Sequence, residues 1–201
     1  MIRFIIKSLC IVFSLLVLGC GKKELSPRDY MTWLQENRSN LIKRKEVGNF
    51  FFEVEYMPAA EMILKDIKDP EIDIKKFRKE LREEQNMQCF VFKIGLIGEY
   101  DIMNYGVTGA NDYSLRVKYF SFDMQNDLQL VDGKDTLCCQ HHIFERTYGL
   151  TPHLTFSEGF SAINNDNEEK IFIFNDRMFG NGPIKIKFEK RLISSIPVIK
   201  L

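Results

Sequence analysis

The residues in this chain that are best suited to chemistry lie in one short run of the sequence. Cys138 and Cys139 are followed by His141 and His142, and Glu145 ends the run. A helix would place His141 and Glu145 on one face, where they could bind zinc. The segment has the pattern of a strand instead, on which four residues span roughly 13 Å. The helical His-Glu-x-x-His spacing of zinc enzymes is also absent from the sequence, so we expect no metal site here.

A thiol nucleophile is the other chemistry that this run could supply. Cys138 or Cys139 would need a histidine as its base, and His141, His142 and His153 are the candidates. A catalytic thiolate requires a positioned base and a lowered pKa, and closeness in the sequence shows neither. The sequence also has no Gly-x-Ser-x-Gly elbow, phosphate loop or dinucleotide fingerprint. We therefore expect no catalytic residues and no cofactor.

A short apolar segment at the N-terminus decides where the rest of the chain is located. Residues 1–7 carry Arg3 and Lys7 and no acid, and residues 8–18 are almost wholly apolar. A charged start, an apolar run of about 7–15 residues and a small residue at its end are typical of a secretory signal. A membrane-spanning helix needs about 20 apolar residues, whereas this run breaks at Gly19. The segment is therefore predicted to be a signal and not a permanent span.

The end of this signal, Val17-Leu18-Gly19-Cys20, resembles the lipobox of bacterial lipoproteins. The resemblance implies that the sulfur of Cys20 receives a diacylglycerol, that the chain is cut before Cys20, and that the new N-terminus is acylated. Three buried chains at ~0.8 kcal/mol per CH₂ would far exceed the marginal binding of one myristoyl group. The bilayer is then a partner through acylated Cys20, and Cys10 is lost with the signal. The alternative is an ordinary cleaved signal that happens to precede a cysteine.

Composition limits what the cleaved chain can be. Loss of residues 1–19 leaves 182 residues, which suits one domain, with residues 20–25 as a tether and residues 26–201 as a single β-rich domain. The whole chain has 28 basic and 28 acidic residues, so removal of Arg3 and Lys7 gives a net charge of −2. A nucleic-acid-binding protein would normally show a basic face. We therefore expect no nucleic-acid partner.

Three cysteines besides Cys20 remain after cleavage: Cys89, Cys138 and Cys139. An exported chain can form a disulfide, and an odd count leaves at least one thiol outside any pair. Neighbouring residues on a strand point to opposite faces, so only one of Cys138 and Cys139 could meet Cys89. A disulfide between Cys89 and Cys138 and a set of three buried, reduced cysteines are both open.

Helices are expected in the N-terminal half of the domain. Ser26-Pro27-Arg28-Asp29 is typical of a helix start, with Ser26 as the cap and Pro27 at the first helical position. Trp33 lies on the apolar face of this helix, where a packing role is favoured over a ligand platform. Two more helices are expected over 59–68 and from Asp69 to about residue 84, the second with a highly charged outer surface.

Strands dominate the rest of the chain. The clearest alternation of apolar and polar residues covers 49–57, and the run from Cys89 to Ile97 is apolar on both faces, as expected for a central strand. Further strands are expected over 113–122, 128–131, 136–148, 154–160, 170–174 and 184–188. Such a series of strands favours a mainly β (α+β) fold, an antiparallel β-sandwich-like domain of about eight strands with helices in the N-terminal half.

Two resemblances concern the exported chain. Asp135-Thr136-Leu137 is similar to the acceptor that some Bacteroidetes use for O-glycosylation, which would modify Thr136. Stretches across most of the mature chain resemble a set of uncharacterised outer-membrane lipoproteins of Bacteroidetes-type bacteria. They are Tyr30-Met31-Thr32-Trp33, Phe50-Phe51-Phe52-Glu53-Val54-Glu55-Tyr56-Met57-Pro58, Tyr119-Phe120-Ser121-Phe122 and Phe144-Glu145-Arg146-Thr147-Tyr148-Gly149-Leu150-Thr151-Pro152.

The second resemblance implies an envelope location, most simply the outer membrane, and carries over no catalytic residue. The polar run Gly21-Lys22-Lys23-Glu24 only loosely approaches an acid-rich surface-export signal, so both faces of that membrane remain open. We therefore expect a lipid-anchored, non-enzymatic binding module of the bacterial envelope, with an envelope protein as its partner. The alternative hypothesis is an envelope hydrolase that uses the His141/His142/Glu145 region.

Overall fold

The structure is a computed structural model that describes residues 22–66, 74–84, 86–98, 100–162 and 168–200. The expected signal, with Cys10 and Cys20, lies outside the described residues. The same is true of the expected helix start at Asp69. The predictions for these positions therefore remain predictions.

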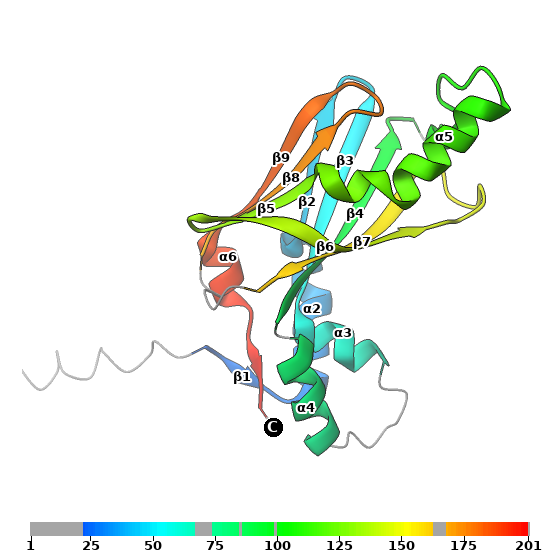
Figure 1. Ribbon diagram of the computed structural model, residues 1–201. Helices are drawn as coiled ribbons and strands as arrows, with labels where there is room; N and C mark the ends of the chain where they lie inside the picture. The colour runs from blue at the N-terminus through cyan, green and yellow to red at the C-terminus, as the bar shows by residue number, and fades with distance from the viewer. Residues whose placement is uncertain (1–21, 67–73, 85, 99, 163–167, 201) are drawn as a thin grey trace, which may run out of the picture.

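Eight antiparallel strands form one sheet that curls into a nearly closed barrel (Figure 1). In spatial order they are β2 (Ile42–Val47), β3 (Phe50–Met57), β4 (Met87–Leu96), β7 (Leu154–Ser161), β6 (Asp135–Glu145), β5 (Leu128–Asp132), β8 (Lys170–Asp176) and β9 (Gly182–Phe188). The end strands β2 and β9 approach each other without a ladder between them. The prediction of a mainly β, antiparallel domain of about eight strands is confirmed.

Phenylalanine rings fill the inside of the barrel. Phe52 and Val54 alternate along β3 with partly exposed residues, as the two-residue period of that strand predicts. Phe92 of β4 packs against Phe172 and Phe174 of β8, with ring centroids 5.1 and 5.3 Å apart. Since β4 and β8 are not neighbours in the sheet, these contacts join opposite walls. The barrel interior is therefore a packed core.

The N-terminal helices cover one end of the barrel, which we call the base. α2 (Pro27–Leu41) begins as expected, because the backbone N–H of Asp29 donates to Oγ of Ser26 at 3.2 Å. Tyr30 and Leu34 of this helix form a second small core with Ile196, and Trp33 packs against that core. α3 (Ala59–Asp66) and α4 (Ile74–Glu84) lie beside α2 (Figure 1). No helix among the described residues is long and apolar enough to cross a bilayer.

The two ends of the described chain meet at the base. β1 (Glu24–Leu25) pairs in parallel with β10 (Val198–Ile199), and α6 (Lys190–Ser195) connects the last barrel strand to β10. Figure 1 shows β1 and the C-terminus beside α2 and α4, far from α5. The chain therefore enters the domain at its base.

One strand expectation is wrong. Residues 113–122 alternate in polarity, but they form helix α5 (Ala110–Ser121), followed by the 3-10 helix η2 (Asp123–Asp127). Arg116 and Phe120, four residues apart, are the buried residues of α5, and Leu115 points to solvent. The eighth strand of the sheet is instead β2, whose charged sequence Ile42–Val47 did not predict a strand. Charged residues are common on edge strands, where they discourage pairing with other chains.

Candidate binding surface

Strand β6 contains an irregularity that brings two of the predicted chemical residues together. Cys139 pairs with Phe160 of β7 and His141 with Gly159, so one extra residue lies between them as in a β-bulge. Without the bulge, Cys139 and His142 would point to opposite faces of the strand. With it, both side chains face the inside of the barrel.

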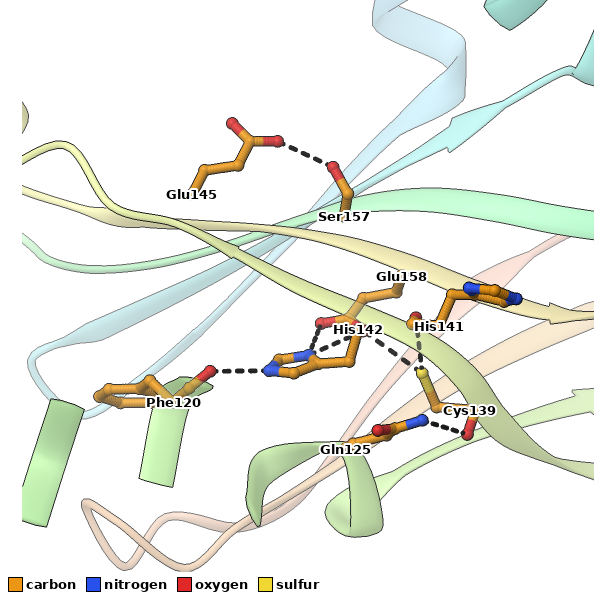
Figure 2. Close-up of polar contacts among 8 residues, drawn as sticks. All are labelled: Phe120, Gln125, Cys139, His141, His142, Glu145, Ser157 and Glu158. Atoms are coloured by element: carbon orange, nitrogen blue, oxygen red, sulfur yellow. Dashed lines mark hydrogen bonds and ion pairs between the residues drawn. The ribbon is translucent and has the colours of Figure 1, made fainter. Parts of the chain in front are cut away.

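A carboxylate from β7 lies between these two side chains (Figure 2). Nδ1 of His142 is 2.9 and 3.0 Å from the two carboxylate oxygens of Glu158, and Sγ of Cys139 is 3.3 Å from Oε2. Nε2 of His142 lies 2.7 Å from the carbonyl oxygen of Phe120 in α5. The side chains of His142 and Glu158 are 1% and 0% exposed. We call Cys139, His142 and Glu158 the buried cluster.

Burial and hydrogen bonding set the protonation of the buried cluster. Both ring nitrogens of His142 face acceptors, an arrangement that suits the doubly protonated imidazolium. Burial lowers the pKa of His142, but the hydrogen bond and charge of Glu158 and the carbonyl of Phe120 outweigh it, so this pKa is raised. Burial also raises the pKa of Glu158, against the opposing effect of His142 and Cys139. The pair can therefore hold its shared proton at neutral pH.

The same environment makes Cys139 a poor nucleophile. Burial and the neighbouring charge of Glu158 raise the pKa of its thiol far above the ordinary value. Both nitrogens of the His142 imidazole are engaged, by Glu158 and by the carbonyl oxygen of Phe120, and the thiol of Cys139 is hydrogen-bonded to Glu158 and to the carbonyl oxygen of His141. A reactive cysteine requires a stabilised thiolate and an available base. The arrangement here joins β6, β7 and α5 and favours a structural role.

The other predicted chemical residues point away from the buried cluster. His141 and Glu145 are exposed on the outer face of β6, and Glu145 accepts a hydrogen bond from Ser157 at 2.8 Å (Figure 2). The set His141, His142 and Glu145 is therefore split between two faces of the sheet, and the arrangement needed by the alternative hydrolase is not formed. Among the described residues, no group of three or more His, Cys, Asp or Glu side chains is placed to hold a metal ion.

The disulfide between Cys89 and Cys138 that the sequence permits is not formed. Cys89 lies on β4 and Cys138 on β6, and β7 runs between these strands. Adjacent strands are about 4.8 Å apart, so strands two places apart exceed the roughly 7 Å reach of a disulfide between Cα atoms. Cys89, Cys138 and Cys139 are all in the thiol form, so a Cys89–Cys138 disulfide is wrong for this structure. Only Cys139 is fully buried, since Cys138 is exposed and Cys89 is half-buried.

A group of large apolar side chains is exposed after the end of β4, at the start of α5 and in the β6–β7 loop. We call it the tyrosine rim, and its members are Ile97, Tyr100, Tyr105, Tyr113, Tyr148 and Leu150. Tyr100, Tyr148 and Leu150 are 68%, 81% and 89% exposed. Isolated exposed apolar residues are common, but several at one end of a domain indicate an interaction surface.

The part of the rim that follows β4 is held rigidly. Nη1 of Arg116 in α5 donates to the backbone carbonyl oxygens of Ile102, Met103 and Tyr105 at 3.1, 3.0 and 2.8 Å. Asp101 caps the 3-10 helix η1 (Ile102–Asn104), because its side chain accepts from the backbone N–H of Met103 at 2.9 Å. The guanidinium of a buried arginine thus fixes the loop that carries Tyr100 and Tyr105.

The β6–β7 loop presents the other half of the rim. Tyr148 has a φ of 51°, which a residue with a Cβ rarely adopts, and Gly149 follows with a φ of 84°. The guanidinium of Arg146 lies 4.9 Å from the centre of the Tyr148 ring. An uncommon backbone conformation that displays an aromatic ring to solvent is often found at binding sites.

Two hollows separate the rim side chains. One, of about 180 Å³, lies between η1 and the β6–β7 loop and is bordered by Tyr113 and Tyr148. The other, of about 600 Å³, is bordered by Tyr100 and Tyr105. Asp101 and Asn104 line both hollows, so η1 forms a ridge between them. The surface is therefore uneven, with aromatic side chains around two depressions.

None of the rim residues was predicted from the sequence as a binding residue. Glu158 was missed as well, although a signal for it exists. It follows Leu154 and Phe156 at alternate positions of β7 and so shares their apolar face, where a carboxylate needs a partner. The rim offered no such signal, because its residues come from three separate segments of the chain.

Comparison with known proteins does not place the chain in a family. No protein-family model matches the chain, and neither a curated protein nor a solved structure is significantly similar to it.

Proposed function

We propose that this chain is a lipid-anchored, non-enzymatic binding module of a bacterial envelope, and that the tyrosine rim takes a protein partner. The observation that carries the proposal is the exposure of four tyrosines, Ile97 and Leu150, of which the tyrosines and Ile97 border two hollows. Tyrosine is enriched in protein interfaces, because its ring supplies apolar area and its hydroxyl a polar contact.

The position of the rim suits an anchored protein. The expected lipid anchor at Cys20 precedes β1 by four residues, and β1 is part of the base. Figure 1 shows α5 and the loops that carry the rim at the opposite end of the molecule from β1. A bilayer that holds the base would leave the rim free to meet another protein.

Size separates the two hollows of the rim. The hollow beside Tyr100 and Tyr105, at about 600 Å³, falls within the roughly 300–1,000 Å³ of ordinary ligand pockets. The hollow between η1 and the β6–β7 loop, at about 180 Å³, is smaller than that range. A cavity of that size suits one inserted side chain. Such an anchor, surrounded by exposed rings, is the usual pattern of a binding hot spot.

The anchor is tested by mass spectrometry of the mature protein purified from a bacterial envelope. We expect an N-terminal cysteine at position 20 that carries a diacylglycerol and an amide-linked acyl chain. An unmodified mature chain that starts at another residue would contradict the lipid-anchored part of the proposal.

The rim is tested by affinity capture from detergent-solubilised envelope. The test variant combines Tyr100→Ala, Tyr148→Ala and Leu150→Ser, and the control combines Phe122→Ala and Ile143→Ala. Phe122 and Ile143 are also exposed apolar residues, but they lie outside the rim. We expect a partner that is recovered reproducibly with the unaltered chain and the control and is lost with the rim variant. Equal recovery by all three, or no reproducible partner, would count against the proposal.

A further inference from the structure

The two hollows of the rim differ in charge as well as in size. The larger one, of about 600 Å³, is bordered by Tyr100 and Tyr105, and among the described residues that line it Asp101 is the only charged one. The smaller hollow is lined by Asp101 and also by Arg146, so a cation of the chain itself lies beside the acid there. We call the larger hollow the acidic hollow.

The two tyrosine rings at the acidic hollow are held in place by their neighbours. The ring of Tyr105 packs at nearly a right angle against that of Phe50 in β3, with centroids 5.3 Å apart. The ring of Tyr100 lies against Gly98, where an added Cβ would come within 2.9 Å of it. Both rings are still reachable from solvent, because Tyr100 is 68% and Tyr105 is 43% exposed. The face of a tyrosine ring carries partial negative charge and attracts cations.

The carboxylate of Asp101 has capacity left for a ligand. One of its oxygens accepts from the backbone N–H of Met103 at 2.9 Å, and the other accepts from the side-chain amide of Asn104 at 2.6 Å. Each oxygen of a carboxylate has room for a second hydrogen bond. Asp101 is exposed, so a donor from outside the chain can reach it. The two internal contacts fix the direction of the carboxylate before any ligand arrives.

The charge around the acidic hollow is negative. Arg116 interacts electrostatically with both Asp101 and Asp112, and its guanidinium donates to three backbone carbonyl oxygens of the rim loop. Two carboxylates against one guanidinium leave a net charge of −1 for these three side chains. The sequence from residue 97 to residue 115 contains no lysine or arginine that could neutralise it. This part of the rim therefore favours a positively charged ligand.

We propose that the acidic hollow takes a basic side chain, a lysine or an arginine, from the protein partner of the rim. The cation lies against the rings of Tyr100 and Tyr105 and pairs with Asp101. Charge complementarity carries this choice, because the ring faces and the carboxylate both attract a cation and both repel an acidic side chain. The inference rests on the proposed function, since it names the chemistry of the partner that the rim is proposed to bind.

The hollow itself is tested with n-butylammonium, which ends like a lysine side chain, and with 1-butanol, which has the same carbon chain and no charge. Each is titrated into the purified full chain with isotope-labelled tyrosine, and NMR follows the ring signals of Tyr100 and Tyr105. We expect n-butylammonium to shift both signals and to bind about fivefold more tightly than 1-butanol, as an exposed ion pair and ring contact imply. Equal affinities, or no shift with n-butylammonium, would overturn the proposal.

Two matched variants test the partner. Asp101→Asn removes the charge and keeps the cap of η1, because asparagine caps as well as aspartate does. Asp112→Asn is the control, since Asp112 also interacts with Arg116 but lines neither hollow. We expect the partner captured by the unaltered chain to bind Asp112→Asn equally and Asp101→Asn about fivefold more weakly. The preference for n-butylammonium should likewise be lost in Asp101→Asn alone.

The outcomes separate this inference from the proposed function. A partner that binds the unaltered chain, Asp112→Asn and Asp101→Asn equally would overturn the basic side chain and leave the rim as an interface. Recovery of no partner by the unaltered chain would overturn both proposals.

Discussion

The buried cluster and the tyrosine rim make opposite use of their residues. The cluster consists of a thiol, an imidazole and a carboxylate, the residue types that enzymes use most, and all three are closed off inside the barrel. The rim consists of tyrosines and aliphatic residues with little chemistry of their own, and they are exposed. Function depends on which groups a ligand can reach, so the less reactive region is the better candidate for the working surface.

The cluster and the rim are nevertheless connected through α5. His142 of the cluster contacts the backbone of Phe120 near the end of this helix, and Arg116 one turn earlier holds the rim loop. The cluster thus fixes the helix that supports the rim. The two regions are therefore expected to respond differently to mutation. Changes in the cluster should act on stability, and changes in the rim should act on binding.

The largest expected effect comes from Glu158→Ala. The change leaves the His142 imidazolium and the Cys139 thiol buried without their acceptor, and breaking a buried pair in this way costs about 3–5 kcal/mol. Chemical denaturation measures the loss. The control is Glu145→Ala on the outer face of β6, for which we expect less than about 1 kcal/mol. A similar loss in both variants would remove the distinction between the cluster and the surface.

A smaller effect is expected from Arg116→Ala. Loss of the guanidinium removes three hydrogen bonds to the rim loop, and we expect about 2 kcal/mol of destabilisation together with faster amide exchange around residues 101–107. Hydrogen exchange with mass spectrometry detects the local change. Lys118→Ala, an exposed change on the same helix, is the control and should leave that exchange unaltered. Equal exchange in both variants would show that Arg116 does not fix the loop.

The pH dependence of stability distinguishes the cluster in another way. The pKa of His142 is raised in the folded chain, so its stabilising effect is fully present below the unfolded value of about 6.5 and is lost as pH rises through the folded value. The difference in unfolding free energy between the unaltered chain and His142→Asn should therefore be largest at low pH and shrink as pH rises. Denaturation series across this range measure it. A difference that grows with pH would contradict the imidazolium assignment.

The smallest expected effect on stability comes from a double change in the rim. Tyr148 and Leu150 are largely exposed, so Tyr148→Ala with Leu150→Ser should change the free energy of unfolding by no more than about 0.5 kcal/mol. The same denaturation measurement applies, with the unaltered chain as reference. A loss of several kcal/mol would mean that the rim is part of the core and would undo the contrast with the cluster.

Much of the fold could be predicted from the sequence because strand alternation is a local signal. The alternation of Phe50, Phe52 and Val54 located β3 correctly, and the strands expected over 128–131 and 170–174 are β5 and β8. Residues 113–122 also alternate, but Arg116 and Phe120 are buried at helical spacing. Tertiary packing decided between these two periods, and a single sequence does not contain that information.

The sites were harder to predict than the fold. The bulge that turns Cys139 and His142 to one face depends on the register with β7, which the sequence of β6 does not encode. The rim depends on the meeting of the segment 97–113 with the β6–β7 loop, which lies more than 30 residues further along the chain. Only Glu158 could have been predicted from the sequence, because it is a carboxylate on the apolar face of its strand.

The most direct test of the rim is site-specific photocrosslinking in cells that make the full chain. A benzophenone amino acid is placed at Tyr148 in the rim and, as the matched exposed position outside it, at Ile143 on the outer face of β6. If the rim is the binding surface, irradiation gives a discrete protein adduct from position 148 and none from position 143. The absence of an adduct at 148, or the same adduct from both positions, would contradict the assignment of the rim.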